Sequence, residues 1–127
     1  MQDLVKDFLE QKSFAVVGSF RHKQKYAYQI LKSLKDNGYE VYPVNPRLKE
    51  IEGLTCYPSI KDIPVVCDVA DIVTPPVVTA KIVRECKEKG ITRIWLQPGA
   101  ESEWAIEFCK QNNLKVIFNL CVMLEGK

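Results

Sequence analysis

Short apolar runs with the character of β-strands alternate with helical patterns along the whole chain. The helical stretches between them are mostly about 10–15 residues long, as in βαβ units with parallel strands and right-handed crossovers. The chain has 127 residues, which is the size of one domain. We therefore predict a single α/β domain over residues 1–127 with a mostly parallel sheet, its strands at residues 14–18, 40–45, 68–73, 92–97 and 114–120.

The helical patterns carry start and stop signals. One helix is predicted over residues 3–11 and a second over 24–37. A third begins after Pro75-Pro76 and ends at Gly90, because proline is favoured at a first helical position and glycine just past the last. A fourth, over residues 101–112, is expected to turn four side chains inward: Trp104, Ala105, Phe108 and Cys109.

The stretch between the second and third strands carries weaker signals. We predict a polar loop from Pro46 to Gly53. Ser59 and Asp62 have the spacing of a capping box, so a short helical turn is predicted after Ser59.

The junction between the first strand and the next helix has the order expected of a phosphate site. The strand ends at Gly18, and Ser19 and Phe20 lead into a basic cluster. A helix N-terminus leaves backbone N–H groups unpaired and carries partial positive charge, so it attracts phosphate. Gly18 supplies either a tight turn or a close phosphate approach, and Ser19 either a helix cap or a phosphate contact. The basic cluster consists of Arg21, His22, Lys23 and Lys25. It is either a solvated face, or it pairs with phosphate through Arg21 or Lys23.

The second strand ends in Asn45-Pro46, where folds that bind NAD usually place an acidic residue for the ribose hydroxyls. The absence of that acid favours a phosphorylated nucleotide other than NAD. Arg47 and Lys49 follow in the loop, and their charges would tolerate the extra phosphate of NADP. An NAD(P)-binding redox or sensor domain therefore stays open as an alternative.

Four segments in order carry a family resemblance: Ala15-Val-Val-Gly-Ser19, Val41-Tyr-Pro-Val-Asn-Pro46, Gly53-Leu-Thr-Cys-Tyr-Pro58 and Ile94-Trp-Leu-Gln-Pro-Gly99. Together they resemble the small stand-alone CoA-binding proteins, which are similar to the CoA-binding domain of the succinyl-CoA synthetase α subunit. The resemblance runs from about residue 11 to 124. It implies a Rossmann-like, five-stranded parallel sheet with helices on both faces. Many relatives place small residues after the first turn, where this chain has Phe20-Arg-His-Lys23.

In this class of fold the ligand lies at the carboxyl edge of the sheet, so the residues directly after each strand are the candidates. The resemblance implies coenzyme A there, with its pyrophosphate on the turn after the first strand and its adenosine beside the second. Arg47 or Lys49 in the loop after the second strand would supply positive charge near the ribose phosphate. Tyr57 would either form an aromatic wall for adenine or serve plain packing. The thiol arm would cross toward the last two strands. The predicted cofactor-binding residues are Gly18, Ser19, Phe20, Arg21, Asn45, Pro46, Arg47, Lys49, Tyr57, Thr74, Pro75, Gln97, Gly99, Asn119 and Cys121.

Cys121 has two interpretations. It follows the last strand, so a pantetheine thiol directed there would form a reversible mixed disulfide with it under oxidation. The plainer interpretation is a buried, inert cysteine, because reactivity needs thiolate character and access. Cys86 and Cys109 are read as small core residues on apolar helix faces.

Composition narrows the classes of partner. The net charge is +2, from 18 basic and 16 acidic residues, which is too balanced to indicate binding to nucleic acid or to an anionic membrane. No apolar run approaches the ~20 residues that span a bilayer, and the N-terminus lacks the apolar segment of a signal peptide, so we expect a cytoplasmic protein. Five cysteines and one histidine offer no Cys-x-x-Cys and no zinc-ligand spacing, so no metal site is predicted.

Catalytic residues are not evident in the sequence. One histidine permits no convincing Ser/His/Asp or Cys/His arrangement, and no Walker loop is present. The acyl-CoA ligases related to the resembled family use a phosphorylated histidine on a second domain that this sequence does not contain. We therefore expect a protein that binds CoA or acyl-CoA without catalysis of its own. A non-catalytic subunit of an acyl-CoA ligase-like complex, or a homo-oligomer, stays open.

Overall fold

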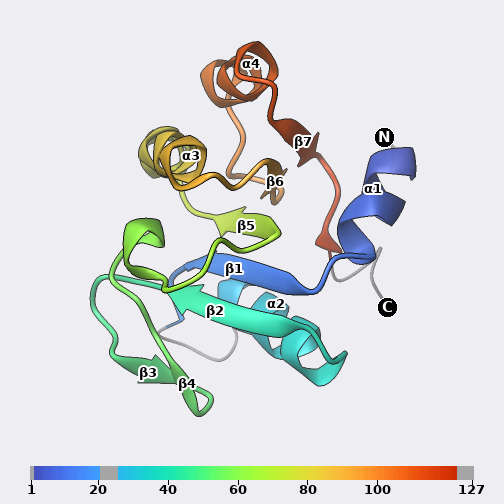
Figure 1. Ribbon diagram of the computed structural model, residues 1–127. Helices are drawn as coiled ribbons and strands as arrows, with labels where there is room; N and C mark the ends of the chain where they lie inside the picture. The colour runs from blue at the N-terminus through green and yellow to red at the C-terminus, as the bar shows by residue number, and fades with distance from the viewer. Residues whose placement is uncertain (1, 21–25, 123–127) are drawn as a thin grey trace.

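The computed structural model describes residues 2–20 and 26–122. Five strands form one parallel sheet in the order β2-β1-β5-β6-β7 (Figure 1). They are β1 (Ser13–Gly18), β2 (Glu40–Val44), β5 (Val69–Val73), β6 (Arg93–Leu96) and β7 (Lys115–Phe118). The predicted Rossmann-like sheet is confirmed. The strand order reverses between β1 and β5, which creates a crevice at the carboxyl ends of these strands.

Four helices cover the two faces of the sheet, as predicted (Figure 1). One face packs against α3 (Pro76–Lys89), α4 (Glu103–Gln111) and the short 3₁₀ helix η1 (Ile60–Asp62). The other face packs against α1 (Gln2–Leu9) and α2 (Tyr26–Asp36). Strand β1 is buried along its full length, because a central parallel strand faces helices on both sides.

The predicted polar loop from Pro46 to Gly53 is wrong in one respect, because it holds one strand of a small hairpin. Strands β3 (Glu50–Ile51) and β4 (Leu54–Thr55) pair antiparallel, and both turn residues have positive φ: Glu52 at 51° and Gly53 at 76°. Positive φ at both central positions defines a type I′ turn. The hairpin contacts α2, since Glu52 accepts hydrogen bonds from the Tyr28 hydroxyl and, through its backbone oxygen, from Lys35 Nζ.

One further prediction needs correction. Trp104, predicted to turn inward, is 44% exposed; it stacks on Phe108 at 5.1 Å, and the Arg84 guanidinium lies 4.8 Å from its ring. Helix α4 begins at Glu103 with Ser102 as its N-cap, and this phase buries Ala105 but leaves Trp104 at the surface. The helical turn after Ser59 is confirmed, although Ser59 donates its proton to the Asp62 carboxylate and accepts no backbone bond.

Candidate functional site at the carboxyl edge of the sheet

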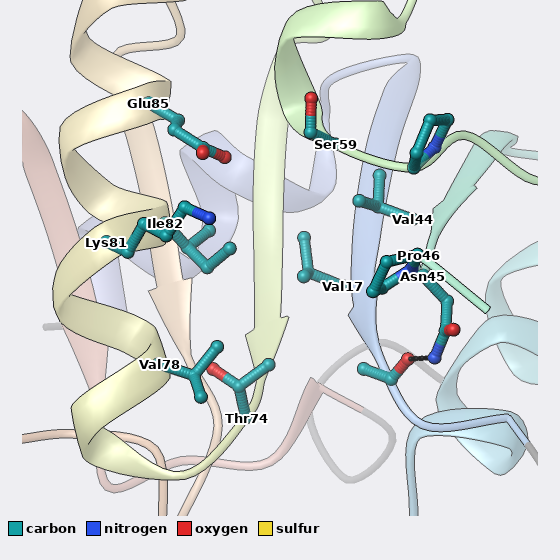
Figure 2. Close-up of a pocket in the computed structure, with 12 residues that line it drawn as sticks. Val17, Val44, Asn45, Pro46, Ser59, Thr74, Val78, Lys81, Ile82 and Glu85 are labelled. Carbon is teal, nitrogen blue, oxygen red and sulfur yellow. Dashed lines mark hydrogen bonds between the residues drawn. The ribbon is translucent and has the colours of Figure 1, made fainter.

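A cavity of about 240 Å³ lies between the ends of β1 and β2 and the facing side of α3 (Figure 2). Val17 and Val44 from the sheet face Val78 and Ile82 from the helix across a mainly apolar slot. Polar groups interrupt this lining at several points. The full lining comprises Val17, Gly18, Val44, Asn45, Pro46, Pro58, Ser59, Thr74, Val78, Lys81, Ile82 and Glu85.

Four of the predicted site residues line this cavity: Gly18, Asn45, Pro46 and Thr74. Packing explains why a glycine occupies position 18. A Cβ at Gly18 would lie 2.7 Å from the Ala27 Cβ and 2.9 Å from the Val73 backbone oxygen. Gly18 therefore lets β1 approach α2 and β5 closely.

Asn45 connects the ends of the two strands that form the floor of the cavity. Its side-chain nitrogen donates to the Gly18 backbone oxygen at 2.7 Å, and its side-chain oxygen accepts from the Arg47 backbone N–H at 2.8 Å. An aspartate could accept the second bond but could not donate the first. The requirement for a donor explains why this strand ends in an amide and not in an acid.

Thr74 joins β5 to α3 at the mouth of the cavity. Its hydroxyl lies 2.8 Å from the hydroxyl of the buried Thr79, which in turn donates to the Pro75 backbone oxygen at 3.2 Å. Pro76 occupies the first helical position, as predicted. These bonds hold the beginning of α3 against the carboxyl end of β5.

The other predicted site residues do not line this cavity. Ser19, Pro75 and Gly99 are exposed, as are Arg47, Lys49 and Asn119. Phe20 is only 2% exposed and packs in the core on the α1 and α2 side. Tyr57 is half-buried against the core on the α3 and α4 side, and its ring centroid lies 6.4 Å from that of Tyr42. Arg21 lies outside the described residues.

Gln97 belongs to a buried polar group inside the sheet. Its side-chain nitrogen donates to Asp71 Oδ1 at 2.6 Å, and its oxygen accepts from the Val122 backbone N–H at 3.2 Å. The second carboxylate oxygen of Asp71 has no hydrogen-bond partner among the described residues. Complete burial raises the pKa of Asp71 to about 7, which the Gln97 hydrogen bond partly offsets.

Cys121 is 8% exposed at the end of the described chain. Burial raises the pKa of Tyr26, and a hydrogen bond with Cys121 raises it further by a smaller amount. Cys86 and Cys109 are fully buried in the core on the α3 and α4 side, and burial raises the pKa of Cys109 to about 11. The prediction of both as core residues is confirmed.

Sequence reasoning missed two charged residues of α3 that line the cavity, Lys81 and Glu85. Glu85 is 6% exposed, and its Oε1 has no hydrogen-bond partner within residues 2–20 and 26–122. The available signal was helical spacing, because Val78, Lys81, Ile82 and Glu85 fall on one face of α3 at steps of three and four.

The comparisons with known proteins agree with this geometry. Residues 12–127 match a protein family described as the CoA binding domain. The chain is 41% identical over 80 residues to an ADP-forming acetate–CoA ligase of Methanocaldococcus jannaschii, and 39% identical over 85 residues to an ADP-forming acetate–CoA ligase II α subunit of Pyrococcus furiosus. A hypothetical protein of Pyrococcus horikoshii superposes with a TM-score of 0.92 at 32% identity, over 98% of this chain and 87% of that one.

The two ligase matches are partial. They include 63% and 66% of this chain, but only 11% of the Methanocaldococcus protein and 19% of the Pyrococcus subunit. Within the described part of this chain, no group of His, Cys, Asp and Glu residues is arranged to hold a metal ion. No helix there is long and apolar enough to cross a membrane.

Proposed function

The chain belongs to the CoA binding domain family, and from this membership we propose that it binds CoA or an acyl-CoA at the carboxyl edge of its sheet. The adenosine occupies the cavity beside Asn45 and Pro46, and the pyrophosphate lies near Gly18 and Ser19. The observation that carries this proposal is the cavity itself, which lies beside the topological switch point and is lined by four of the residues expected there.

The chemistry of the cavity supports an adenosine ligand. The aliphatic side chains of Val17, Val44 and Ile82 suit the apolar faces of a planar base, and the polar groups between them suit its edges. Lys81 at the cavity wall, with Arg47 and Lys49 on the loop after β2, offers positive charge for the phosphates. The pantetheine arm then runs along the sheet edge toward Gly99 and Asn119.

A thermal-shift panel tests the ligand class. CoA, acetyl-CoA, NAD, NADP and ATP are each added at increasing concentration, and the melting temperature is followed. A ligand at about 100 times its dissociation constant stabilises the native state by ~2.7 kcal/mol. We expect CoA to raise the melting temperature more than NAD or NADP does. Equal or greater stabilisation by either dinucleotide would sink the CoA proposal in favour of an NAD(P)-binding domain.

The partial match to ligases favours a second candidate, a CoA-binding subunit of a larger acyl-CoA ligase-like complex. The matching Pyrococcus protein is named as an α subunit, and this chain corresponds to 19% of it. Co-expression with candidate catalytic chains and size-exclusion chromatography tests this role. Co-elution in a fixed ratio, with a gain of ligase activity, is the expected result; elution of this chain alone in every combination speaks against it.

A further inference from the structure

The cavity has two chemically different ends. Figure 2 shows Thr74 and Val78 at one end and Glu85 with Ser59 at the other, with Lys81 and Ile82 between them on the helix side. Thr74 marks the carboxyl edge of the sheet, where phosphates are expected. The Glu85 end lies about two helical turns beyond Val78 along α3, so it is the end that the base reaches.

Glu85 is an unusual residue for that position. Its side chain is 6% exposed, and its Oε1 has no hydrogen-bond partner among the described residues. Lys81 precedes it by one helical turn, yet no ion pair joins the two within the described chain. A buried carboxylate oxygen without a partner is costly, so such a group calls for an explanation.

Ser59 lies across the cavity from Glu85 and adds a second acceptor. Its hydroxyl donates to Asp62 Oδ2 at 2.9 Å, so the Ser59 oxygen keeps its lone pairs as an acceptor among the residues that line the cavity. A carboxylate oxygen also accepts only. Glu85 and Ser59 therefore favour a ligand group with N–H donors. Adenine carries such a group in its exocyclic amine, whereas guanine carries an acceptor oxygen at the equivalent position.

We propose that Glu85 and Ser59 bind the 6-amino group of the adenine base, so that this end of the cavity makes the protein selective for adenine nucleotides. The inference rests on the function proposed above and adds the residues that recognise the base. The two N–H groups of the amine donate to Glu85 Oε1 and to Ser59 Oγ. The unpartnered carboxylate oxygen gains its hydrogen bond when the ligand binds.

The test changes the ligand and the protein together. Isothermal titration calorimetry measures the affinity of CoA and of a CoA analogue with hydrogen in place of the 6-amino group. In the unaltered protein the analogue should bind about 10- to 100-fold more weakly, the range for a hydrogen bond to a charged group. Glu85→Met removes both acceptor oxygens at similar length, so it should bind both ligands with more nearly equal affinity.

Glu88→Gln is the matched control, because Glu88 is an exposed residue of the same helix and its replacement makes the same change in charge. It should keep the full preference for CoA. If the unaltered protein binds both ligands equally, or Glu85→Met keeps the full preference, this inference is wrong while CoA binding stands. If CoA does not bind the unaltered protein, the proposed function itself fails. The comparison of ligands on the unaltered protein holds even if Glu85→Met does not fold.

Discussion

Asn45 shows how one side chain can meet a structural and a binding requirement together. Its amide joins the ends of β1 and β2 through the Gly18 oxygen and also lines the cavity. From the sequence, the missing acid was interpreted as a statement about the ligand. The structure adds a cause within the protein, namely the need for a hydrogen-bond donor. That cause was invisible in the sequence because the partner is a backbone oxygen 27 residues away.

Asn45→Asp should destabilise the protein by about 1–3 kcal/mol at neutral pH, because the Gly18 oxygen loses its donor and faces a carboxylate. Urea denaturation of the ligand-free protein measures this change. Asn37→Asp is a suitable control, since Asn37 is exposed and its side chain donates to the Ser33 backbone oxygen in the last turn of α2. A denaturation midpoint for Asn45→Asp equal to that of the control would contradict the role assigned to Asn45.

Glu85 illustrates a different limit of sequence reasoning at the residue scale. Helical spacing places it beside Val78 and Ile82, but reading α3 for its apolar stripe passes over the charged residue at its margin. Whether such a residue is solvated or buried depends on what lies opposite, and here the segment containing Pro58 and Ser59 lies across the cavity from Glu85.

Among the elements, the strands and long helices were predictable because each carries a periodic pattern several residues long. All five strands of the parallel sheet lie within two residues of their predicted ends, as do the ends of α3. The β3–β4 hairpin has two residues per strand, which is too short for any period to appear. The orientation of Trp104 did not follow from spacing, because Ala105 and Cys109 face the core one turn apart and the adjacent Trp104 lies about 100° further around α4.

The junction of β1, α2 and β5 depends on the absence of a side chain at Gly18. Gly18→Ala should destabilise the ligand-free protein by about 1–3 kcal/mol, the usual cost of overpacking, because the added Cβ meets Ala27 and the Val73 oxygen. Thermal unfolding without ligand checks this. If unfolding is unchanged and CoA affinity alone falls, the glycine serves the ligand and not the packing.

At the scale of the whole molecule, Asp71 couples folding to pH. Its folded pKa of about 7 lies above the ordinary aspartate value of 3.8, so between these two pH values the folded state holds a proton that the unfolded state has lost. Stability from this group is fully present below about pH 4 and declines as pH rises toward 7.

Asp71→Asn should remove this part of the pH dependence. Between pH 4 and 7 the unaltered protein should lose up to about 1.4 kcal/mol of stability per pH unit relative to the variant. Urea denaturation of both proteins at several pH values gives the difference, which cancels contributions from other acids such as Asp68, whose pKa is lowered. Parallel stability curves would show that Asp71 does not titrate in this range.

Among the described residues, every one that lines the cavity lies between positions 17 and 85. Strands β6 and β7 and helix α4 supply none of them, although they complete the sheet and bury Trp95, Ile117 and Cys109. Substitutions in these elements therefore act on the cavity through the framework of the sheet, where Gln97 of the last third bonds to Asp71 of β5. Such substitutions can change how firmly the cavity is held in shape without replacing any of the described side chains that line it.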